Sequence, residues 1–154
     1  MSLWQTLGRG ATRFRALLST PHAPDLVEVE GIRSAAALVR AIDAAMPRGA
    51  ILWIDFPGDE AVELFLGERT GRGFERSGKS FRLPIRGDNL AMLARLVEGA
   101  PLRALGIHLG VDHERRRLLA AYDLDSAPVE VNVSPRLPAE SQRIFRLIAT
   151  GQAR

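Results

Sequence analysis

The chain of 154 residues contains no cysteine and a single lysine, Lys79. The absence of cysteine excludes disulfide bonds, thiolate metal ligands and a cysteine nucleophile. No apolar run approaches the roughly 18 residues that a membrane-spanning helix requires. The N-terminal region also lacks a compact apolar core followed by small residues at a cleavage site, so we expect no secretory signal and a cytoplasmic location.

The composition is that of an ordinary globular protein, with 46% hydrophobic and 25% charged residues. The formal net charge of +3 is too small to attract nucleic acid to the molecule as a whole. All of the basic residues except Lys79 are arginines, which we interpret as the codon usage of a GC-rich bacterial genome. The length predicts one α/β domain over residues 21–154, preceded by a separate N-terminal helix over residues 1–20.

The N-terminal helix is predicted from an apolar stripe at three- and four-residue spacing, with Arg9 and Arg13 away from the stripe. A helix packed on the domain and a basic helix lying on an anionic membrane both fit this amphipathic pattern. The stripe consists of Leu3, Trp4, Leu7, Ala11, Phe14, Leu17 and Leu18.

Residues 50–56 form the stretch around which we expect the rest of the chain to pack. They are almost entirely apolar and lie between turn-forming Pro and Gly residues, a pattern typical of a strand that is covered on both faces. Residues 26–30 alternate as a half-buried strand does, and Ser34 is a suitable N-cap for a helix over residues 35–46. These three elements predict a βαβ unit with a parallel pair of strands and a right-handed crossover.

The remaining elements predict an antiparallel meander with helices packed on a mixed sheet, an α+β variant of the α/β class. Asp59 and Asp88 are candidate N-caps, and Glu68 to Ser80 is expected to be a long exposed loop. The predicted helices cover residues 60–67, 89–98 and 138–150, and the predicted strands cover residues 81–85, 104–111, 118–123 and 129–133.

Residues 73–80 match the pattern G-x-x-x-x-G-K-[ST] and resemble, over those eight residues alone, the Walker A loop of P-loop NTPases. The resemblance implies a phosphate-binding loop using Gly73, Gly78, Lys79 and Ser80. Such a loop leaves a buried strand and runs directly into a helix. Here no strand precedes the octet, and Pro84 follows too soon for a helix, so we expect an exposed loop without a bound nucleotide or other cofactor.

The same loop is locally cationic and is our candidate contact for an acidic protein surface or an anion. Its candidate contact residues are Arg69, Arg72, Arg76 and Lys79. Solvation of the charged side chains is the commoner meaning of such a run.

No other residue group predicts catalysis or a metal site. His108 falls in an apolar strand, where a hydrogen-bonded core or sheet-face histidine is expected, and residues 112–114 lie in a turn where three neighbours rarely converge on one ion. Asp55 is the unusual residue, a carboxylate at the end of an apolar strand, which we expect to cap the turn that follows. The arginines at 115–117 divide between the two faces of a strand, so nucleic-acid binding is not favoured.

We therefore predict a small non-catalytic module that acts through contacts with another protein or with a second copy of itself. The first alternative is a nucleotide- or phosphate-binding protein that uses residues 73–80. The second is a nucleic-acid-binding protein that uses its arginines.

Overall fold

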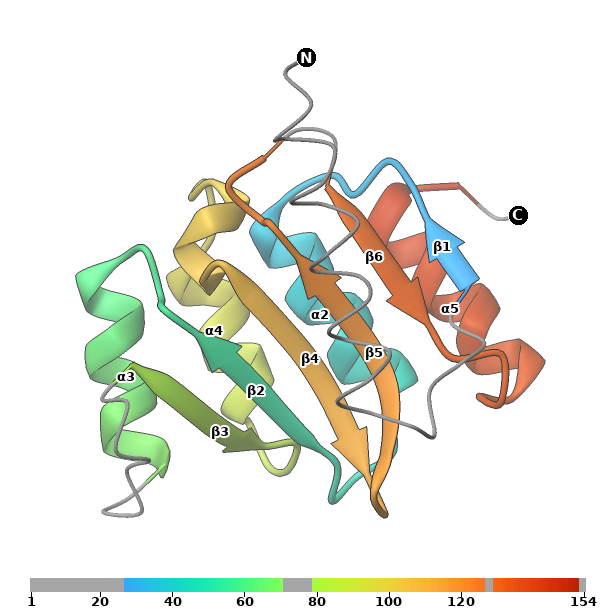
Figure 1. The fold of residues 1–154 in the computed structure, drawn as a ribbon, viewed down its shortest axis with the longest axis horizontal. Helices are drawn as coiled ribbons and strands as arrows, with labels where there is room; N and C mark the ends of the chain where they lie inside the picture. Colours follow the sequence, from blue (N-terminus) through green and yellow to red (C-terminus); the bar gives the residue numbers. More distant parts are fainter. Residues whose placement is uncertain (1–26, 71–78, 127–128, 153–154) are drawn as a thin grey trace, which may run out of the picture.

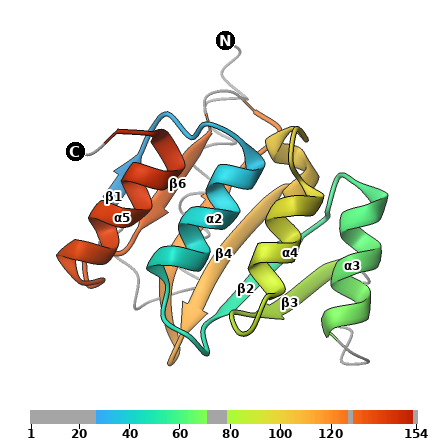
Figure 2. The same ribbon diagram turned by 180° about the vertical axis from the view of Figure 1, so that it is seen from behind.

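The computed structural model describes residues 27–70, 79–126 and 129–152, so the helix predicted over residues 1–20 lies outside the described part of the chain. Within the described residues, six antiparallel strands form one sheet in the order β1-β6-β5-β4-β2-β3. The described α-helices lie together on one face of this sheet (Figure 1 and Figure 2). The predicted class, helices packed on a sheet that ends in an antiparallel meander, is confirmed.

The bounds of the elements follow the chain order. They are β1 (Val27–Val29), α2 (Ala35–Ala45), β2 (Ile51–Asp55), α3 (Glu60–Thr70), β3 (Ser80–Pro84), α4 (Asn89–Leu96), the 3-10 helix η1 (Leu102–Leu105), β4 (His108–His113), β5 (Arg116–Tyr122), β6 (Glu130–Val133) and α5 (Ala139–Thr150).

The βαβ unit is present, but its two strands are not neighbours. β1 pairs with β6, whereas β2 lies between β3 and β4. Four antiparallel steps separate β1 from β2, so the two strands run in the same direction with three strands between them. The predicted parallel pair is therefore wrong. Apolar patterning reports which faces of a strand are buried, and it does not identify the strand that lies alongside.

The core lies between the sheet and the helices. In β2, Leu52 and Ile54 belong to this core, because alternate side chains of a strand point to the same face. The helices contribute the opposite wall, including Leu38 of α2, Leu93 of α4 and Phe145 of α5, all fully buried. Ser34 caps α2 as predicted, with its side chain accepting the backbone N–H of Ala37 at 3.0 Å.

Helix α3 is longer than its sequence pattern predicts. It continues through Gly67 to Thr70, so Arg69 lies on a helix and not in the exposed loop expected from residue 68 onward. The predicted cap at Asp59 is confirmed, since its carboxylate accepts the N–H groups of Ala61 and Val62 at 2.8 and 3.2 Å. Packing of α3 on the edge strand β3 extends the helix past its glycine.

The hairpin between β4 and β5 is tighter than predicted. Its turn consists of Glu114 and Arg115, which both have positive φ values, 49° and 63°. Two such residues are typical of a type I′ turn, whose twist matches that of the flanking strands. β4 begins at His108, four residues later than predicted, because residues 102–105 form the 3-10 helix η1. Among the described helices, none has the length and hydropathy needed to cross a bilayer.

Candidate functional site

The face of the sheet opposite the described helices carries a row of polar side chains, and we call it the helix-free face. The strand register places Ser80 of β3 opposite Asp55 of β2, and Asp55 opposite His108 of β4. On the next strands, the rings of His108 and Tyr122 meet edge to face with 5.4 Å between centroids, and Tyr122 lies opposite Glu130. Five strands thus contribute one residue each to a single line across the sheet.

The first two members of this row are joined by a hydrogen bond. The Ser80 hydroxyl donates to Asp55 Oδ1 at 2.6 Å, so the carboxylate has a cross-strand partner and not the turn-capping contact that we expected. The backbone N–H of Asp123 donates to Nδ1 of His108 at 3.4 Å. His108 is half-buried on the sheet face, in agreement with the prediction for this residue.

The order of these three residues determines what they can do chemically. A serine nucleophile is activated by a histidine nitrogen, and a carboxylate orients that histidine from the other side. Here the carboxylate of Asp55 lies between Ser80 and His108, because β2 lies between β3 and β4. In addition, Nδ1 of His108 already accepts a backbone N–H. The row therefore does not provide the serine–histidine–carboxylate relay.

A second cluster on the same face surrounds Trp53. Its indole lies against Gly110, where an added Cβ atom would be 2.3 Å from Trp53 Cζ2. The Arg117 guanidinium stacks over the Trp53 ring at 4.6 Å from the centroid, and its Nε donates to Asp112 Oδ1 at 2.5 Å. Gly110 therefore makes room for the ring, and the Arg117–Asp112 pair holds it from β5 and β4.

Tyr122 connects the cluster to the row. Arg117 Nη1 donates to its hydroxyl oxygen at 3.4 Å. Burial raises the pKa of Tyr122 above its ordinary value, and the neighbouring Arg117 charge opposes this shift in pKa. The Tyr122 hydroxyl is therefore protonated at neutral pH and can both donate and accept a hydrogen bond.

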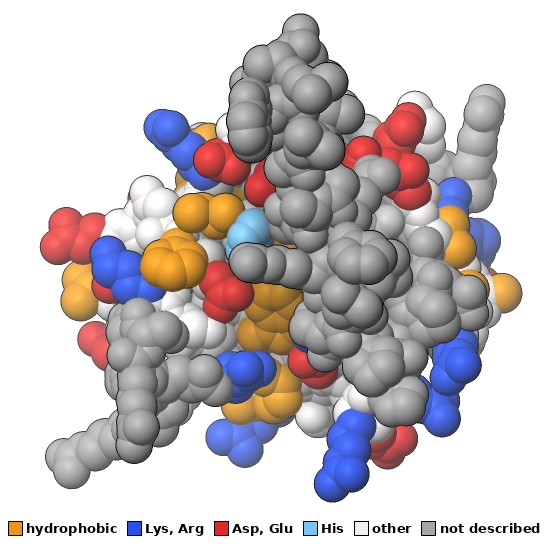
Figure 3. All heavy atoms as spheres, in the orientation of Figure 1, with side chains coloured by type: hydrophobic (Ala, Val, Ile, Leu, Met, Phe, Trp, Pro, Cys, Tyr) orange, Lys and Arg blue, Asp and Glu red, His pale blue; other side chains and the backbone are white. Residues whose placement is uncertain are grey.

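Two exposed apolar side chains lie next to the row, and we call them the Phe56–Ile107 patch. Phe56 directly follows Asp55 and is 49% exposed, while Ile107 directly precedes His108 and is 38% exposed. The backbone N–H of Phe56 donates to Lys79 O at 2.8 Å, and that of Ile107 donates to Asp55 O at 2.9 Å. Figure 3 shows this face of the molecule, with apolar and acidic side chains beside a histidine.

The backbone under the patch is closely packed and strained. Phe56 has a φ of 55°, a left-handed conformation that is uncommon for a bulky residue. Gly106 has a φ of 106°, and a Cβ atom there would be 2.4 Å from Asp55 O. A Cβ atom on Gly58 would be 2.5 Å from Arg103 O. The sequence does not reveal this site, because a positive φ on a phenylalanine and an exposed aromatic side chain leave no recognisable pattern.

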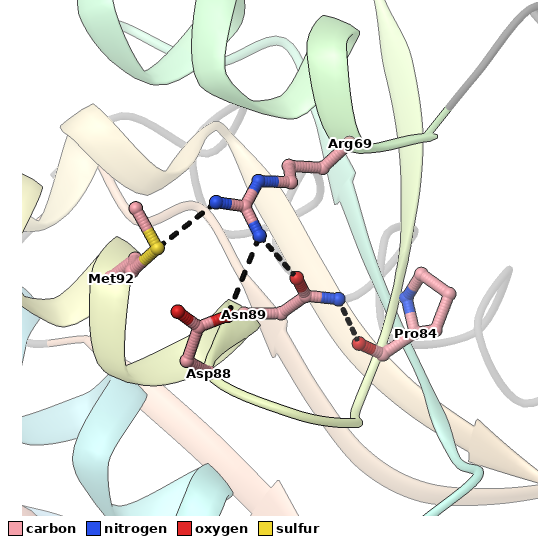
Figure 4. Close-up of polar contacts among 5 residues, drawn as sticks. All are labelled: Arg69, Pro84, Asp88, Asn89 and Met92. Atoms are coloured by element: carbon pink, nitrogen blue, oxygen red, sulfur yellow. Dashed lines mark hydrogen bonds and ion pairs between the residues drawn. The ribbon is translucent and has the colours of Figure 1, made fainter.

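The four predicted contact residues do not form one described surface. Arg69 is exposed, and its guanidinium is bound between α3, α4 and β3 (Figure 4). Its guanidinium donates to Asn89 Oδ1 at 3.0 Å and to Met92 Sδ at 2.9 Å, and lies 3.5 Å from Asp88 Oδ1. The Asn89 amide in turn donates to Pro84 O at 3.0 Å. The guanidinium thus links two helices, and Asp88 contacts it without making the predicted cap to α4.

The other members of the predicted cationic loop divide between described and undescribed residues. Arg72 and Arg76 lie outside the described part of the chain, and so do Gly73 and Gly78 of the Walker-like octet. Lys79 is exposed, and Ser80 is the first residue of β3. The described elements on either side of the octet are thus helix α3 before it and strand β3 after it, the reverse of the strand–loop–helix order of a P-loop.

Within residues 27–70, 79–126 and 129–152, no three or more metal-ligating side chains come together. Arg116 and Arg117 pair with His113 and Asp112 respectively, at neighbouring positions of the ladder, as expected for arginines that divide between two faces.

Comparison of the chain with protein-family models, curated proteins and solved structures found no significant match.

Proposed function

We propose that this protein is a non-catalytic interaction module that contacts another protein through the Phe56–Ile107 patch. The observation that carries the proposal is an exposed phenylalanine held in a left-handed backbone conformation by hydrogen bonds from two other chain segments. The polar row from Ser80 to Tyr122 provides hydrogen-bonding groups beside this patch.

The conformation of Phe56 has a free-energy cost that its own packing does not explain. A left-handed backbone costs an L-residue roughly 1–2 kcal/mol, and glycine avoids most of that cost. Half of the Phe56 side chain remains in water, so the ring recovers only part of its possible burial energy. Strained residues of this kind cluster where a surface is used for binding.

The surroundings of the patch fit a protein contact. Protein interfaces combine an apolar, often aromatic, centre with a polar rim. Phe56 and Ile107 supply an apolar centre, and the exposed Lys79 with the half-buried Asp55 and His108 supply polar groups next to it. The backbone bonds among these segments position the groups before binding, which limits the entropy lost on association.

The test is affinity capture from an extract of the source organism with matched surface variants. Wild type, Phe56→Ser and Leu64→Ser are immobilised at equal density, Leu64 being a 62% exposed residue on α3. We expect a protein that wild type and Leu64→Ser retain and that Phe56→Ser loses. Equal capture by all three proteins, or a loss in both variants, would contradict the patch as the contact surface.

A self-association arm uses the purified protein alone. Sedimentation over a concentration series shows whether wild type forms a dimer that Phe56→Ser does not form, in which case the partner is a second copy.

The phosphate-binding alternative predicts a thermal shift with Mg-ATP that Lys79→Ala abolishes. We expect no shift with either protein, because the described elements do not place a helix after Ser80.

A further inference from the structure

We propose that residues 3–18 of the chain form an amphipathic helix that docks on the helix-free face of its own sheet, over Trp53. This surface adjoins the Phe56–Ile107 patch but is distinct from it, so the proposal goes beyond the function proposed above. It rests on the burial of the helix-free face, the length of chain before β1, and the pattern of that chain.

The centre of the helix-free face has the character of a covered surface. Trp53 is 7% exposed and Ala120 is fully buried, although no described helix lies on this face. Gly110 and Ala120 add little bulk, so the centre is shallow beside the Trp53 ring, over which the Arg117 guanidinium stacks. Sheets with one apolar face covered by helices and a second apolar centre require a second covering element.

Trp53 also has an unfulfilled hydrogen-bonding group. Its Nε1 is buried and, among the described residues, has no hydrogen-bond partner. Buried indole N–H groups usually find an acceptor, and leaving one unpaired costs about 1–3 kcal/mol. A segment docked over the ring can supply that acceptor from a polar side chain or a backbone carbonyl.

The chain before β1 has the required reach. Residues 19–26 can extend about 26 Å at roughly 3.3 Å per residue. The distance from β1 to β2 is four strand spacings, or about 19 Å at roughly 4.8 Å each. A helix over residues 3–18 is about 24 Å long, which is enough to cross β6, β5 and β4 and to cover Trp53.

The pattern of residues 3–18 fits that surface. Leu7, Ala11, Phe14 and Leu18 lie on one side of a helix, whereas Arg9 and Ala16 lie on the opposite side. The segment contains three arginines and no acidic residue. On the helix-free face, the strand register places more carboxylates than guanidinium groups, so the electrostatic attraction favours docking. The carboxylates are Glu28, Asp55, Asp112 and Glu130, and the guanidinium groups are those of Arg82 and Arg117.

The test uses bimane, a fluorophore that tryptophan quenches on contact, attached to a single introduced cysteine. The 154-residue chain has no cysteine, and Trp4→Phe leaves Trp53 as its only tryptophan. Ala11→Cys places the probe in the centre of the apolar stripe, and Ala16→Cys places it on the opposite side of the same helix. Each labelled protein is compared with its Trp53→Phe counterpart.

We expect a loss of emission for the probe at position 11 that depends on Trp53 and does not change with protein concentration. The probe at position 16 should keep its emission. Emission at position 11 that is unaffected by Trp53, equal quenching at both positions, or quenching that grows with concentration would each overturn the proposal. The last result would mean that a second copy supplies the segment.

Two further comparisons separate docking from a folding defect of Trp53→Phe and from the partner contact at Phe56. If Trp53→Phe fails to fold, judged by circular dichroism, the probes at positions 11 and 16 are compared directly with Trp53 in place. Phe56→Ser in the same labelled background should leave the quenching unchanged. The docking proposal and the partner-contact proposal can therefore fail independently.

Discussion

The two faces of the sheet are built from different residues, although the same strands supply both. The helix-covered face consists of aliphatic side chains such as Leu52, Ile54 and Leu83, packed with Phe145 into one continuous core. The helix-free face carries Trp53 and a row of ionisable and hydroxyl groups that bond to one another across the strands. Stability therefore depends mainly on one face, and the chemistry available for recognition is concentrated on the other.

The two faces of the sheet also differ in backbone strain. The turns that carry the Phe56–Ile107 patch contain a left-handed phenylalanine and two glycines whose Cβ positions are blocked by backbone oxygens. The helix-covered face uses the capping and spacing rules of regular helices, as at Ser34 and Asp59. The large core keeps the strained turns in place, because the burial energy summed over many side chains exceeds the local free-energy cost of a strained turn.

The largest effect is expected on the helix-covered face. Phe145→Ala removes a fully buried ring and should lower the free energy of unfolding by about 3–5 kcal/mol. The matched control is Leu147→Ala on the same helix, where the side chain is 43% exposed and the loss should stay within about 1 kcal/mol. Urea denaturation of both variants measures the difference. Equal losses would contradict the assignment of the core to this face.

The next effect tests the packing of the helix-free face. Gly110→Ala places a methyl group against Trp53 and close to Leu119 O, and should destabilise the protein by about 1–3 kcal/mol. Trp53→Ala removes the ring and so relieves much of the clash. The double variant should therefore be more stable than the sum of the single losses predicts. Strictly additive losses in denaturation would show that the ring does not lie on Gly110.

A smaller effect concerns the strained turn. Phe56→Gly relieves the left-handed conformation, whereas Phe56→Ala keeps it, and both remove the ring. Phe56→Gly should therefore be more stable than Phe56→Ala by about 1 kcal/mol. Thermal unfolding of the two proteins gives the comparison. A less stable glycine variant would mean that the positive φ at this residue carries no strain.

The smallest expected effect is on the ionisation of Tyr122, which is followed by spectroscopy. Tyr122 is the only tyrosine, so ultraviolet absorbance follows its ionisation alone. Because burial raises its pKa, the folded protein should titrate above the ordinary pKa of 10.0. The folded state then holds this proton more tightly than the unfolded state. The corresponding stability is present in full below pH 10.0 and is lost as pH rises through the folded pKa.

Arg117 provides the control for that titration. Its charge lowers the pKa of Tyr122, so Arg117→Met should move the midpoint further upward. A midpoint at or below the ordinary value in the wild type, or a downward shift in the variant, would contradict the contacts described for this residue.

Much of the fold could be predicted from local signals. The apolar run at residues 50–56 indicated a buried strand, although β2 lies next to the edge strand β3 and not at the centre of the sheet, and Ser34 and Asp59 indicated helix starts, because caps and burial patterns are encoded within a few residues. The neighbours of β2 could not be predicted in the same way. β4 lies more than fifty residues further along the chain, and its pairing depends on packing of the whole sheet.

The candidate site was harder to predict for the same reason. Ser80, Asp55 and His108 come from three distant segments and meet only when the strand order and register are known. In the sequence each belongs to a separate pattern: Ser80 to a phosphate-loop motif, Asp55 to the end of an apolar strand and His108 to the face of a sheet. Arg69 shows another case, since the run of arginines predicts its exposure but not the bonds of its guanidinium to Asn89 and Met92.

Site-specific photocrosslinking tests the central claim, that recognition takes place at the Phe56–Ile107 patch. A benzophenone analogue of phenylalanine is introduced at position 56 in one protein and at position 64 in another, and both are irradiated in extract of the source organism. We predict a defined crosslinked product from position 56 that is absent from position 64. No product from position 56, or the same products from both positions, would contradict the account.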